Sequence, residues 1–285
     1  MNYKSNTHCY NFKSITYNDS LLKSIDATYI IHLENNGRLQ DIERQLEKYH
    51  PSKQVYIVFN KGYKKCDKIL KEQSSTFDLK DANLNVLQHS IDNNHKTILV
   101  LEDDYIFSDK INTEKGYLDE FLFENKNEAM IYYIGCLPLV NIPIGLKHLR
   151  MFWGQATHSC IYTESVKQNL LRNSDSVNDW DMYLNSSPYV KRYRYYIPLC
   201  YQTFPHTENR DNWKNVIYYG EYLTPITDFF INLLQADKKP EPSFTILYIF
   251  SYFLTALIIF VLVYLLYRIS KLFLSKNIQK KLFLT

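Results

Sequence analysis

The hydrophobic pattern of the first sixty residues alternates between strand and helix. Ala27–Leu33 and Gln54–Asn60 are runs of β-branched and aromatic residues of strand length. Between them Leu39, Ile42 and Leu46 recur at helical spacing, with charged residues in the intervening positions. The chain therefore opens as a β-α-β unit, which predicts two parallel strands joined by a right-handed crossover.

The pattern continues with a helix and two further strands. Apolar residues at helical spacing predict a helix over residues 81–93. Thr97–Leu101 is a continuous apolar run, which is typical of a central strand buried on both faces. Met130–Ile134 predicts another strand, ending at Gly135. The alternation predicts an α/β fold with a Rossmann-like, mostly parallel sheet flanked by helices.

Three carboxylates follow the central strand directly: Glu102, Asp103 and Asp104. In open α/β sheets, ligands bind beyond the carboxyl ends of the strands. Adjacent carboxylates repel one another unless they are solvated or neutralised, and ligands that offer only oxygen suit Mg²⁺ or Mn²⁺. The alternative is a solvated acidic turn. At the tip of a buried central strand we favour the metal site.

A long apolar segment lies near the C-terminus. Phe244–Tyr267 contains no charged residue, and as a helix it would extend about 36 Å, enough to cross a hydrocarbon core of about 30 Å. The alternative, a buried core helix, is rarely this long. The sequence therefore predicts one transmembrane helix over 244–267, after a linker over 236–243 and before a basic tail over 268–285.

Charge is unevenly distributed along the chain. The formal net charge is +3, from 33 basic and 30 acidic residues. The tail holds basic residues and no acid: Arg268, Lys271, Lys276, Lys280 and Lys281. The rest of the chain is slightly acidic, which argues against nucleic acid as the main partner, while the basic tail indicates a membrane surface.

Two observations bear on the compartment. The polar N-terminus has no apolar signal-peptide core, so we expect a single-pass protein whose main domain stays cytosolic. The positive-inside rule points the other way, because it would place the basic tail in the cytoplasm. The cysteines are widely spaced and form no C-x-x-C motif, which argues against a zinc site or disulfide and for a reducing compartment: Cys9, Cys66, Cys136, Cys160 and Cys200.

The central strand and its acidic end resemble those of a GT-A-fold glycosyltransferase. The sequence ILVLEDD is followed by Tyr105–Phe107, and within that fold it is most similar to glycosyltransferase family 25, the lipooligosaccharide and collagen galactosyltransferases. The resemblance covers roughly Ala27 to Trp213. We expect an N-terminal extension over 1–25 and a glycosyltransferase-like main domain over 26–235. Three later segments resemble the family's histidine-containing strand, its P-V-D-x-x-M segment and its P-L-V-x-Q strand: Thr157–Thr163, Val177–Met182 and Tyr196–Gln202.

The resemblance implies transfer of a sugar from a nucleotide sugar, most simply a UDP-sugar, to a hydroxyl of a glycan, protein or lipid, with inversion. Glu102 and Asp104 would take the first and last positions of the D-x-D motif, with Asp104 binding Mn²⁺ or Mg²⁺ directly. Glu102 would support the ribose or the water shell of the metal, and Asp103 also belongs to this donor side. Where the family has Ser-His before the central strand, this chain has Ala82 and Asn83, so Asn83 is the candidate for binding the donor at this place.

Four later residues complete the expected site. Asp179 is the first candidate for the general base and Asp181 the second, although either could instead cap a helix. His206 is a candidate metal ligand and Arg210 a candidate for binding diphosphate oxygens. The alternative for His206 is a surface-loop histidine.

Other functions are weighed against this one. A response-regulator receiver domain would need an aspartate at the end of the Met130–Ile134 strand, where Gly135 stands. A nucleotidylyltransferase would need a glycine-rich loop after the first strand, but Leu33–Arg38 contains one glycine. A catalytically degenerate transferase, kept as a membrane-tethered binding or scaffold protein, stays open.

Overall fold

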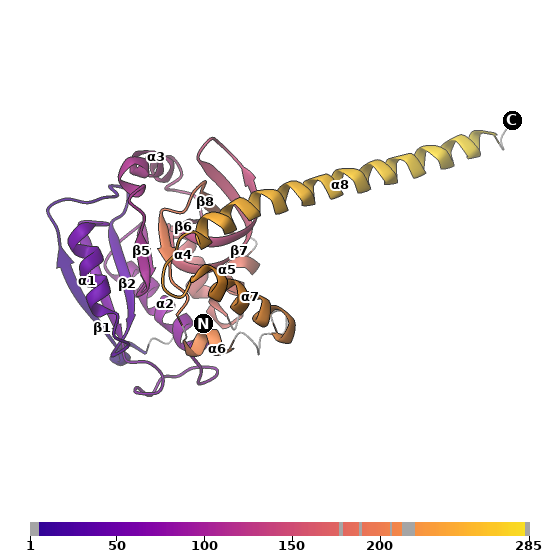
Figure 1. The fold of residues 1–285 in the computed structure, drawn as a ribbon. Helices are drawn as coiled ribbons and strands as arrows, with labels where there is room; N and C mark the ends of the chain where they lie inside the picture. The colour runs from indigo at the N-terminus through magenta and orange to yellow at the C-terminus, as the bar shows by residue number, and fades with distance from the viewer. Residues whose placement is uncertain (1–5, 177–178, 188–189, 206, 213–219, 283–285) are drawn as a thin grey trace.

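A computed structural model describes residues 6–176, 179–187, 190–205, 207–212 and 220–282 (Figure 1). Its main sheet has seven strands in the order β1-β3-β2-β4-β7-β6-β8. The strands are β1 (Tyr10–Thr16), β2 (Ala27–Leu33), β3 (Gln54–Asn60), β4 (Ile98–Glu102), β6 (Met130–Pro143), β7 (His148–Tyr162) and β8 (Lys191–Tyr195). All but β1 and β7 run in one direction. The predicted mostly parallel α/β fold is confirmed.

The helices are α1 (Leu39–Lys48), α2 (Ser75–Asp92), α3 (Ile111–Glu124), α4 (Glu164–Arg172), α5 (Trp180–Ser186), α6 (Glu208–Asn212), α7 (Gly220–Leu234) and α8 (Ser243–Leu282), with 3₁₀ turns η1 (Thr7–Cys9) and η2 (Ser174–Ser176). Helices α1 and α3 cover one face of the sheet, and α2, α4 and α5 cover the other. The predicted β-α-β opening is confirmed, because β2 and β3 are parallel and α1 connects them. Helix α2 starts before the predicted residue 81, because the Ser74 side chain caps it by accepting from the backbone N–H of Phe77.

The buried residues of β4 divide between two hydrophobic clusters, one on each face of the sheet. Ile98 and Val100 pack with residues of α2, whereas Leu99 and Leu101 pack with residues of α1 and α3. Strand side chains alternate between faces, so a continuous apolar run is what a strand covered on both sides requires. The prediction of a central strand over Thr97–Leu101 is confirmed.

Strand β6 does not end at Gly135, as the sequence suggested, but continues to Pro143. A Cβ atom at Gly135 would lie 2.0 Å from the carbonyl oxygen of Cys200 and 2.6 Å from Nε2 of His158. Glycine therefore stands here because another segment crosses the strand closely, and not because the strand stops. The segment that crosses is β9 (Cys200–Gln202), which pairs with β5 (Tyr105–Phe107) in a separate two-stranded sheet.

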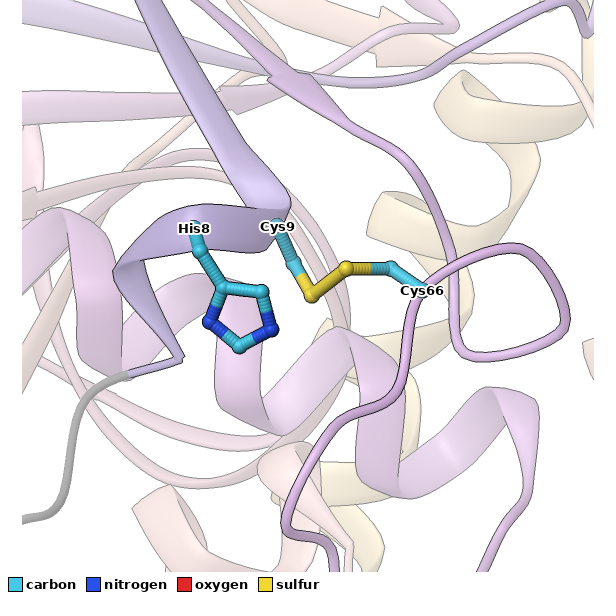
Figure 2. A group of neighbouring side chains, drawn as sticks. All are labelled: His8, Cys9 and Cys66. Carbon is cyan, nitrogen blue, oxygen red and sulfur yellow. A yellow bond between two sulfur atoms is a disulfide. The ribbon is translucent and has the colours of Figure 1, made fainter.

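The N-terminal residues contribute the edge strand β1, which is antiparallel to β3. A disulfide joins Cys9, just before β1, to Cys66 in the loop after β3 (Figure 2). The expectation that the chain has no disulfide is therefore wrong. Pairing of β1 with β3 brings together two cysteines separated by 57 residues, a proximity that local spacing cannot reveal. Cys136, Cys160 and Cys200 are free and buried.

Helix α8 leaves the domain as one long helix (Figure 1). Phe244, Tyr248, Ser251 and Thr255 are buried against the domain, and they recur along one face of the helix. Beyond Thr255 the described side chains are exposed or half-exposed. The segment Ser243–Lys271 is long and apolar enough to cross a membrane.

Candidate functional site

A cavity of about 250 Å³ lies beyond the carboxyl ends of β2, β3 and β4. The residues that line it include the three acids after β4, two arginines and one glutamine: Glu102, Asp103, Asp104, Arg38, Arg210 and Gln202. The position is the one expected for a ligand site in an open α/β sheet. The structure therefore brings the three predicted acids together with Arg210 at one cavity.

Both carboxylate oxygens of Asp103 have hydrogen-bond partners within the protein. Its carboxylate accepts hydrogen bonds from Nδ1 of His32 (3.2 Å), the backbone N–H of Leu33 (3.1 Å), Nδ2 of Asn36 (2.5 Å) and Nη1 of Arg38 (2.6 Å). Burial acts to raise the pKa of Asp103, but these hydrogen bonds and the Arg38 charge outweigh it and lower the pKa. Asp103 therefore fastens the loop after β2 to the end of β4.

Asp104 is only half satisfied. Its Oδ2 accepts a hydrogen bond of 3.1 Å from Nε2 of Gln202 and lies 3.6 Å from Nη1 of Arg38. Its Oδ1 is buried and has no hydrogen-bond partner among the described residues. Burial, followed by the charge of Asp103, raises the pKa of Asp104 to about 7. A buried carboxylate oxygen without a donor is a place where a cation is strongly favoured.

Asp181 on α5 lies near enough to Glu102 to affect its pKa, although the residues that line the cavity include Glu102 and not Asp181. Burial, followed by the charges of Asp104 and Asp181, raises the pKa of Glu102 well above its usual range. Asp181 accepts a hydrogen bond of 2.8 Å from the backbone N–H of Ala156. Burial, followed by the charge of Asp179, raises the pKa of Asp181 to about 6. The pKa values of Glu102, Asp104 and Asp181 are thus all raised, and we call these three residues the acidic cluster.

An irregularity in β7 creates the hydrogen bond between Asp181 and Ala156. The pairing of β6 with β7 shifts between Gly135↔Ser159 and Leu137↔Gln155, so extra residues of β7 bulge outward there. Ala156 has a φ of +58°, which is uncommon for a residue with a Cβ atom. Bulges and strained backbone concentrate near functional sites, and here the strained residue donates to the Asp181 carboxylate.

Asp179 has a clear structural role. It is the N-cap of α5, and its Oδ1 accepts a hydrogen bond of 2.9 Å from the backbone N–H of Met182. This is the helix-capping alternative considered from the sequence. Val177 and Asn178 of the same segment lie outside the described residues. Of the two predicted base candidates, the geometry favours Asp181.

The three remaining predicted residues are Arg210, Asn83 and His206. Arg210 lines the cavity, but it donates to the carbonyl oxygen of Phe204 (2.7 Å) and is paired with Asp228 (2.7 Å). Asn83 is buried in α2 and donates to the carbonyl oxygen of Leu79 in the same helix, and the cavity lining does not include it. His206 lies outside the described residues.

Three residues of types that can bind a metal lie close together at the disulfide, and the cavity lining does not include them. Ligand atoms of His8, Cys9 and Cys66 lie within 4.8 Å of one another (Figure 2). Because the two sulfurs are bonded to each other, these residues do not form a metal site. At the cavity, Asp104 and Glu102 can hold Mn²⁺ or Mg²⁺ only if another molecule supplies further oxygens. That arrangement is usual for Mg²⁺, which is often bound by one or two carboxylates together with substrate phosphates.

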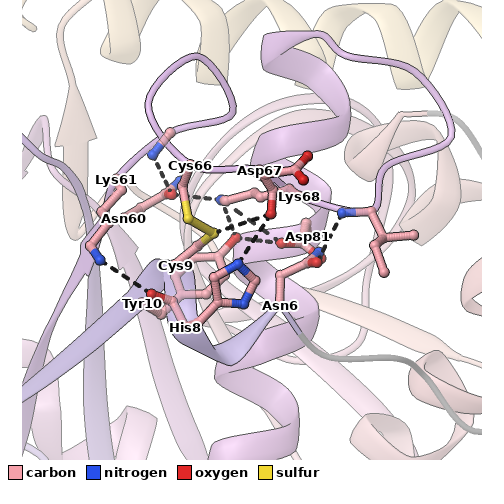
Figure 3. Close-up of a disulfide and its surroundings, with 12 residues drawn as sticks. Asn6, His8, Cys9, Tyr10, Asn60, Lys61, Cys66, Asp67, Lys68 and Asp81 are labelled. Atoms are coloured by element: carbon pink, nitrogen blue, oxygen red, sulfur yellow. Dashed lines mark hydrogen bonds and ion pairs between the residues drawn. A yellow bond between two sulfur atoms is a disulfide. The ribbon is translucent and has the colours of Figure 1, made fainter.

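A buried lysine beside the cavity could not be identified from the sequence. Next to the disulfide, the Nζ atom of Lys68 contacts Asn60 (2.7 Å) and the hydroxyl of Tyr10 (2.6 Å) (Figure 3). The same atom contacts Asp78 (2.5 Å). Asn60 and Asp78 both line the cavity. No sequence motif predicts this network, because Tyr10 comes from the edge strand β1, far away in the sequence, which pairs with β3. The network fixes the polar wall formed by the end of β3 and the start of α2.

Arg38 is a further site residue that the sequence analysis did not select. It lies in the loop after β2 and lines the cavity, with 23% of its side chain exposed. Burial alone would lower the pKa of its guanidinium, but Asp103 and Asp104 raise it, so the group stays charged. Its position after the first strand of a β-α-β unit was the available signal, since loops at that end of the sheet face the ligand site.

The sequence matches no protein-family model and no curated protein at a significant level. Among solved structures, it is similar to a glycosyltransferase involved in the glycosylation of the major capsid of PBCV-1, with 10% identity, a TM-score of 0.31, and coverage of 57% of this chain and 72% of that one. It is also similar to an apo UDP-glucose pyrophosphorylase (11% identity, TM-score 0.34, coverage 60% and 72%). A third similar structure is a putative glucose-1-phosphate thymidylyltransferase from Bacillus anthracis in complex with a sucrose, with 12% identity, a TM-score of 0.34, and coverage of 64% of this chain and 73% of that one. At these values we base no functional conclusion on the likenesses, and membership of glycosyltransferase family 25 stays a prediction.

Proposed function

We propose that this protein is a glycosyltransferase that moves a sugar from a nucleotide-sugar donor to an acceptor hydroxyl at the cavity beyond β4. The observation that carries the proposal is the buried, half-satisfied carboxylate of Asp104 beside Glu102. A cavity with more carboxyl groups than its own cations can pair is suited to a ligand that brings a divalent cation. A nucleoside diphosphate with Mn²⁺ or Mg²⁺ is such a ligand, and a UDP-sugar is the donor we favour.

On the donor side, Asp104 binds the ion directly, and Glu102 supports its water shell or the ribose. The ion, when bound, offsets the negative charge that develops on the departing nucleoside diphosphate, an effect worth several kcal/mol in similar sites. Arg38 is charged and faces the cavity 3.6 Å from Asp104, so its guanidinium can contact phosphate oxygens that approach the same carboxylate. Arg210 also lines the cavity, where Asp228 and the Phe204 carbonyl orient it.

On the acceptor side, Asp181 is the group we assign to proton removal. A carboxylate with a pKa of about 6 is a better base than an ordinary aspartate and is still largely ionised near neutral pH. Its hydrogen bond to Ala156 fixes its orientation. The acceptor hydroxyl would give its proton to Asp181 as its oxygen attacks the anomeric carbon and the bond to the diphosphate breaks, with inversion. Asp179 keeps α5 in place as its N-cap.

The direct test combines binding with turnover. A panel of nucleotide sugars is assayed for hydrolysis and transfer with and without MnCl₂, and UDP is titrated calorimetrically under both conditions. We expect Mn²⁺-dependent binding of UDP and turnover of at least one donor. Binding without turnover of any donor would favour the degenerate scaffold instead. Absence of any binding of UDP, with or without Mn²⁺, would overturn the proposed site for this donor class.

A further inference from the structure

Helix α7 presents an apolar stripe to the outside of the domain. Ile226, Phe229, Phe230 and Leu233 recur at i, i+3, i+4 and i+7, and each is between 51% and 62% exposed. This spacing places them on one helix face. Ile231, on another face, is buried. An amphipathic helix normally turns its apolar stripe inward, so an outward stripe of this kind marks a surface that binds something.

A second apolar patch lies at the turn between β6 and β7. Ile142 is 44% exposed, Ile144 50% and Leu146 99%. This hairpin runs along the anchor helix, because the backbone N–H of Asn141 donates to Oγ1 of Thr255 in α8 (3.1 Å). The apolar turn therefore lies beside the segment of α8 that a membrane would have to enclose.

The length of α8 decides where the membrane begins. Beyond Thr255, only residues 256–267 precede the first charged residue, Arg268, and twelve helical residues extend about 18 Å. A hydrocarbon core of about 30 Å needs about twenty residues, so a span that ends at Tyr267 begins near Tyr248. The stretch from Tyr248 to Thr255 is thus both packed on the domain and within membrane depth.

The two faces of this stretch fit that placement. Toward the domain, Ser251 accepts a hydrogen bond of 3.2 Å from Nη2 of Arg194, and Thr255 donates to the carbonyl oxygen of Ser251, so the polar groups are satisfied inside the protein. Away from the domain, Ile249, Phe250 and Phe253 are 50%, 53% and 71% exposed. Apolar side chains face outward where lipid would be, and polar ones face inward.

We propose that the catalytic domain docks on the bilayer through an apolar collar around the base of α8, which consists of Ile142, Ile144 and Leu146 on the hairpin and Ile226, Phe229, Phe230 and Leu233 on α7. Thr255 lies seven residues beyond Tyr248, a rise of about 10 Å along the helix, and amphipathic surface helices enter membranes by about 5–10 Å. Lys238 and Lys239, exposed just after α7, are suited to lipid headgroups. The proposal rests on α8 as the anchor and is independent of the reaction.

Depth-dependent fluorescence quenching tests the collar in the full-length protein. The protein is reconstituted into phosphatidylcholine vesicles that contain some phosphatidylglycerol, with or without bromine on the lipid acyl chains. Tryptophan is introduced at two collar positions, Leu146→Trp and Phe230→Trp. The matched controls are Ile69→Trp and Phe123→Trp, at apolar residues that are 77% and 65% exposed but outside the collar. The unsubstituted protein corrects for its own three tryptophans.

We expect bromolipids to quench the two collar tryptophans several-fold more than the two controls, and most strongly with bromine at shallow positions. Leu146 is almost completely exposed, so its substitution leaves the fold intact and keeps the test valid if Phe230→Trp fails to fold. Quenching of the collar tryptophans no greater than that of the controls would overturn the proposal. Blue-shifted collar emission without bromine quenching would also overturn it, because a second protein copy would then cover the surface.

Discussion

Gln202 holds one oxygen of Asp104 through a hydrogen bond of 3.1 Å and leaves the other buried without a partner in the described structure. The neighbouring residue of Gln202 on β9, Tyr201, packs edge-on against Phe244 at the start of α8, with ring centroids 5.6 Å apart. The acidic end of β4 is therefore connected through one short strand, β9, to the base of helix α8.

The first prediction concerns Asp104→Asn. The substitution keeps the shape and the contact with Gln202 but removes the charge that would hold the cation. Losing a few kcal/mol of transition-state stabilisation lowers turnover by roughly two or more orders of magnitude, and Mn²⁺-dependent binding of UDP should weaken with it. The fold should survive and gain some stability without metal, because repulsion within the acidic cluster falls.

Calorimetry with UDP and Mn²⁺, alongside thermal unfolding, measures both effects. The matched control is Asp41→Asn, which removes a carboxylate that is 57% exposed on α1 and should change neither quantity. Wild-type affinity and metal dependence in Asp104→Asn would mean that the cluster is only a buried acidic turn, and the proposed mechanism would fail.

The second prediction concerns pH. The folded-state pKa of Asp104 is about 7, above the ordinary aspartate value near 4, so the folded protein binds more protons than the unfolded chain between those values. The stability of the metal-free protein should therefore fall as the pH rises from about 4 to about 7 and then level off. Mn²⁺ competes with the proton, so its stabilising effect should be larger above pH 7 than at pH 5.

Thermal unfolding across this range, with and without MnCl₂, checks the sign. Asp104→Asn should flatten part of the pH dependence, while Glu102 and Asp181 account for the remainder. Stability that rises with pH through this window in the metal-free protein would contradict the assignment.

The sequence predicts well those features that depend on neighbouring residues. The β-α-β opening and the buried strand that ends in acids follow from local periodicity, and both are present. Features that depend on distant pairing were missed: the Cys9–Cys66 disulfide, the Lys68 network and the continuation of β6 past Gly135. Each requires knowing which segments lie side by side, which a pattern within one segment cannot show.

The third prediction separates the two aspartates of α5. Asp181→Asn retains an oxygen that can accept from Ala156, but it cannot take a proton, so transfer should fall by roughly two to four orders of magnitude while UDP binding stays nearly unchanged. Asp179→Ala removes the N-cap and should cost about 1 kcal/mol of stability, whereas Asp179→Asn retains a cap and should remain active. Turnover, UDP titration and thermal unfolding of the three variants provide the comparison. Loss of transfer in Asp179→Asn but not in Asp181→Asn would assign the base to Asp179.

The fourth prediction concerns the disulfide and the membrane orientation. Without reductant, alkylation of the denatured full-length protein should label three cysteines, Cys136, Cys160 and Cys200, and reduction should expose two more. Cys66→Ser should lower stability by about 2–4 kcal/mol and leave Cys9 reactive. Free Cys9 and Cys66 in protein isolated with its thiols trapped would contradict the pairing.

The disulfide favours a different compartment from the reducing one expected from the sequence. Disulfides persist in oxidising compartments, and a domain on that side places the basic residues after Tyr267 in the cytoplasm, as the positive-inside rule prefers. The disulfide therefore agrees with the positive-inside rule, and both oppose the cytosolic placement expected from the polar N-terminus. Protease added to intact, inward-sealed vesicles with the cytoplasmic face outside should remove only the C-terminal tail and spare the domain. Digestion of the domain under these conditions would show that it faces the cytosol, as the polar N-terminus had suggested.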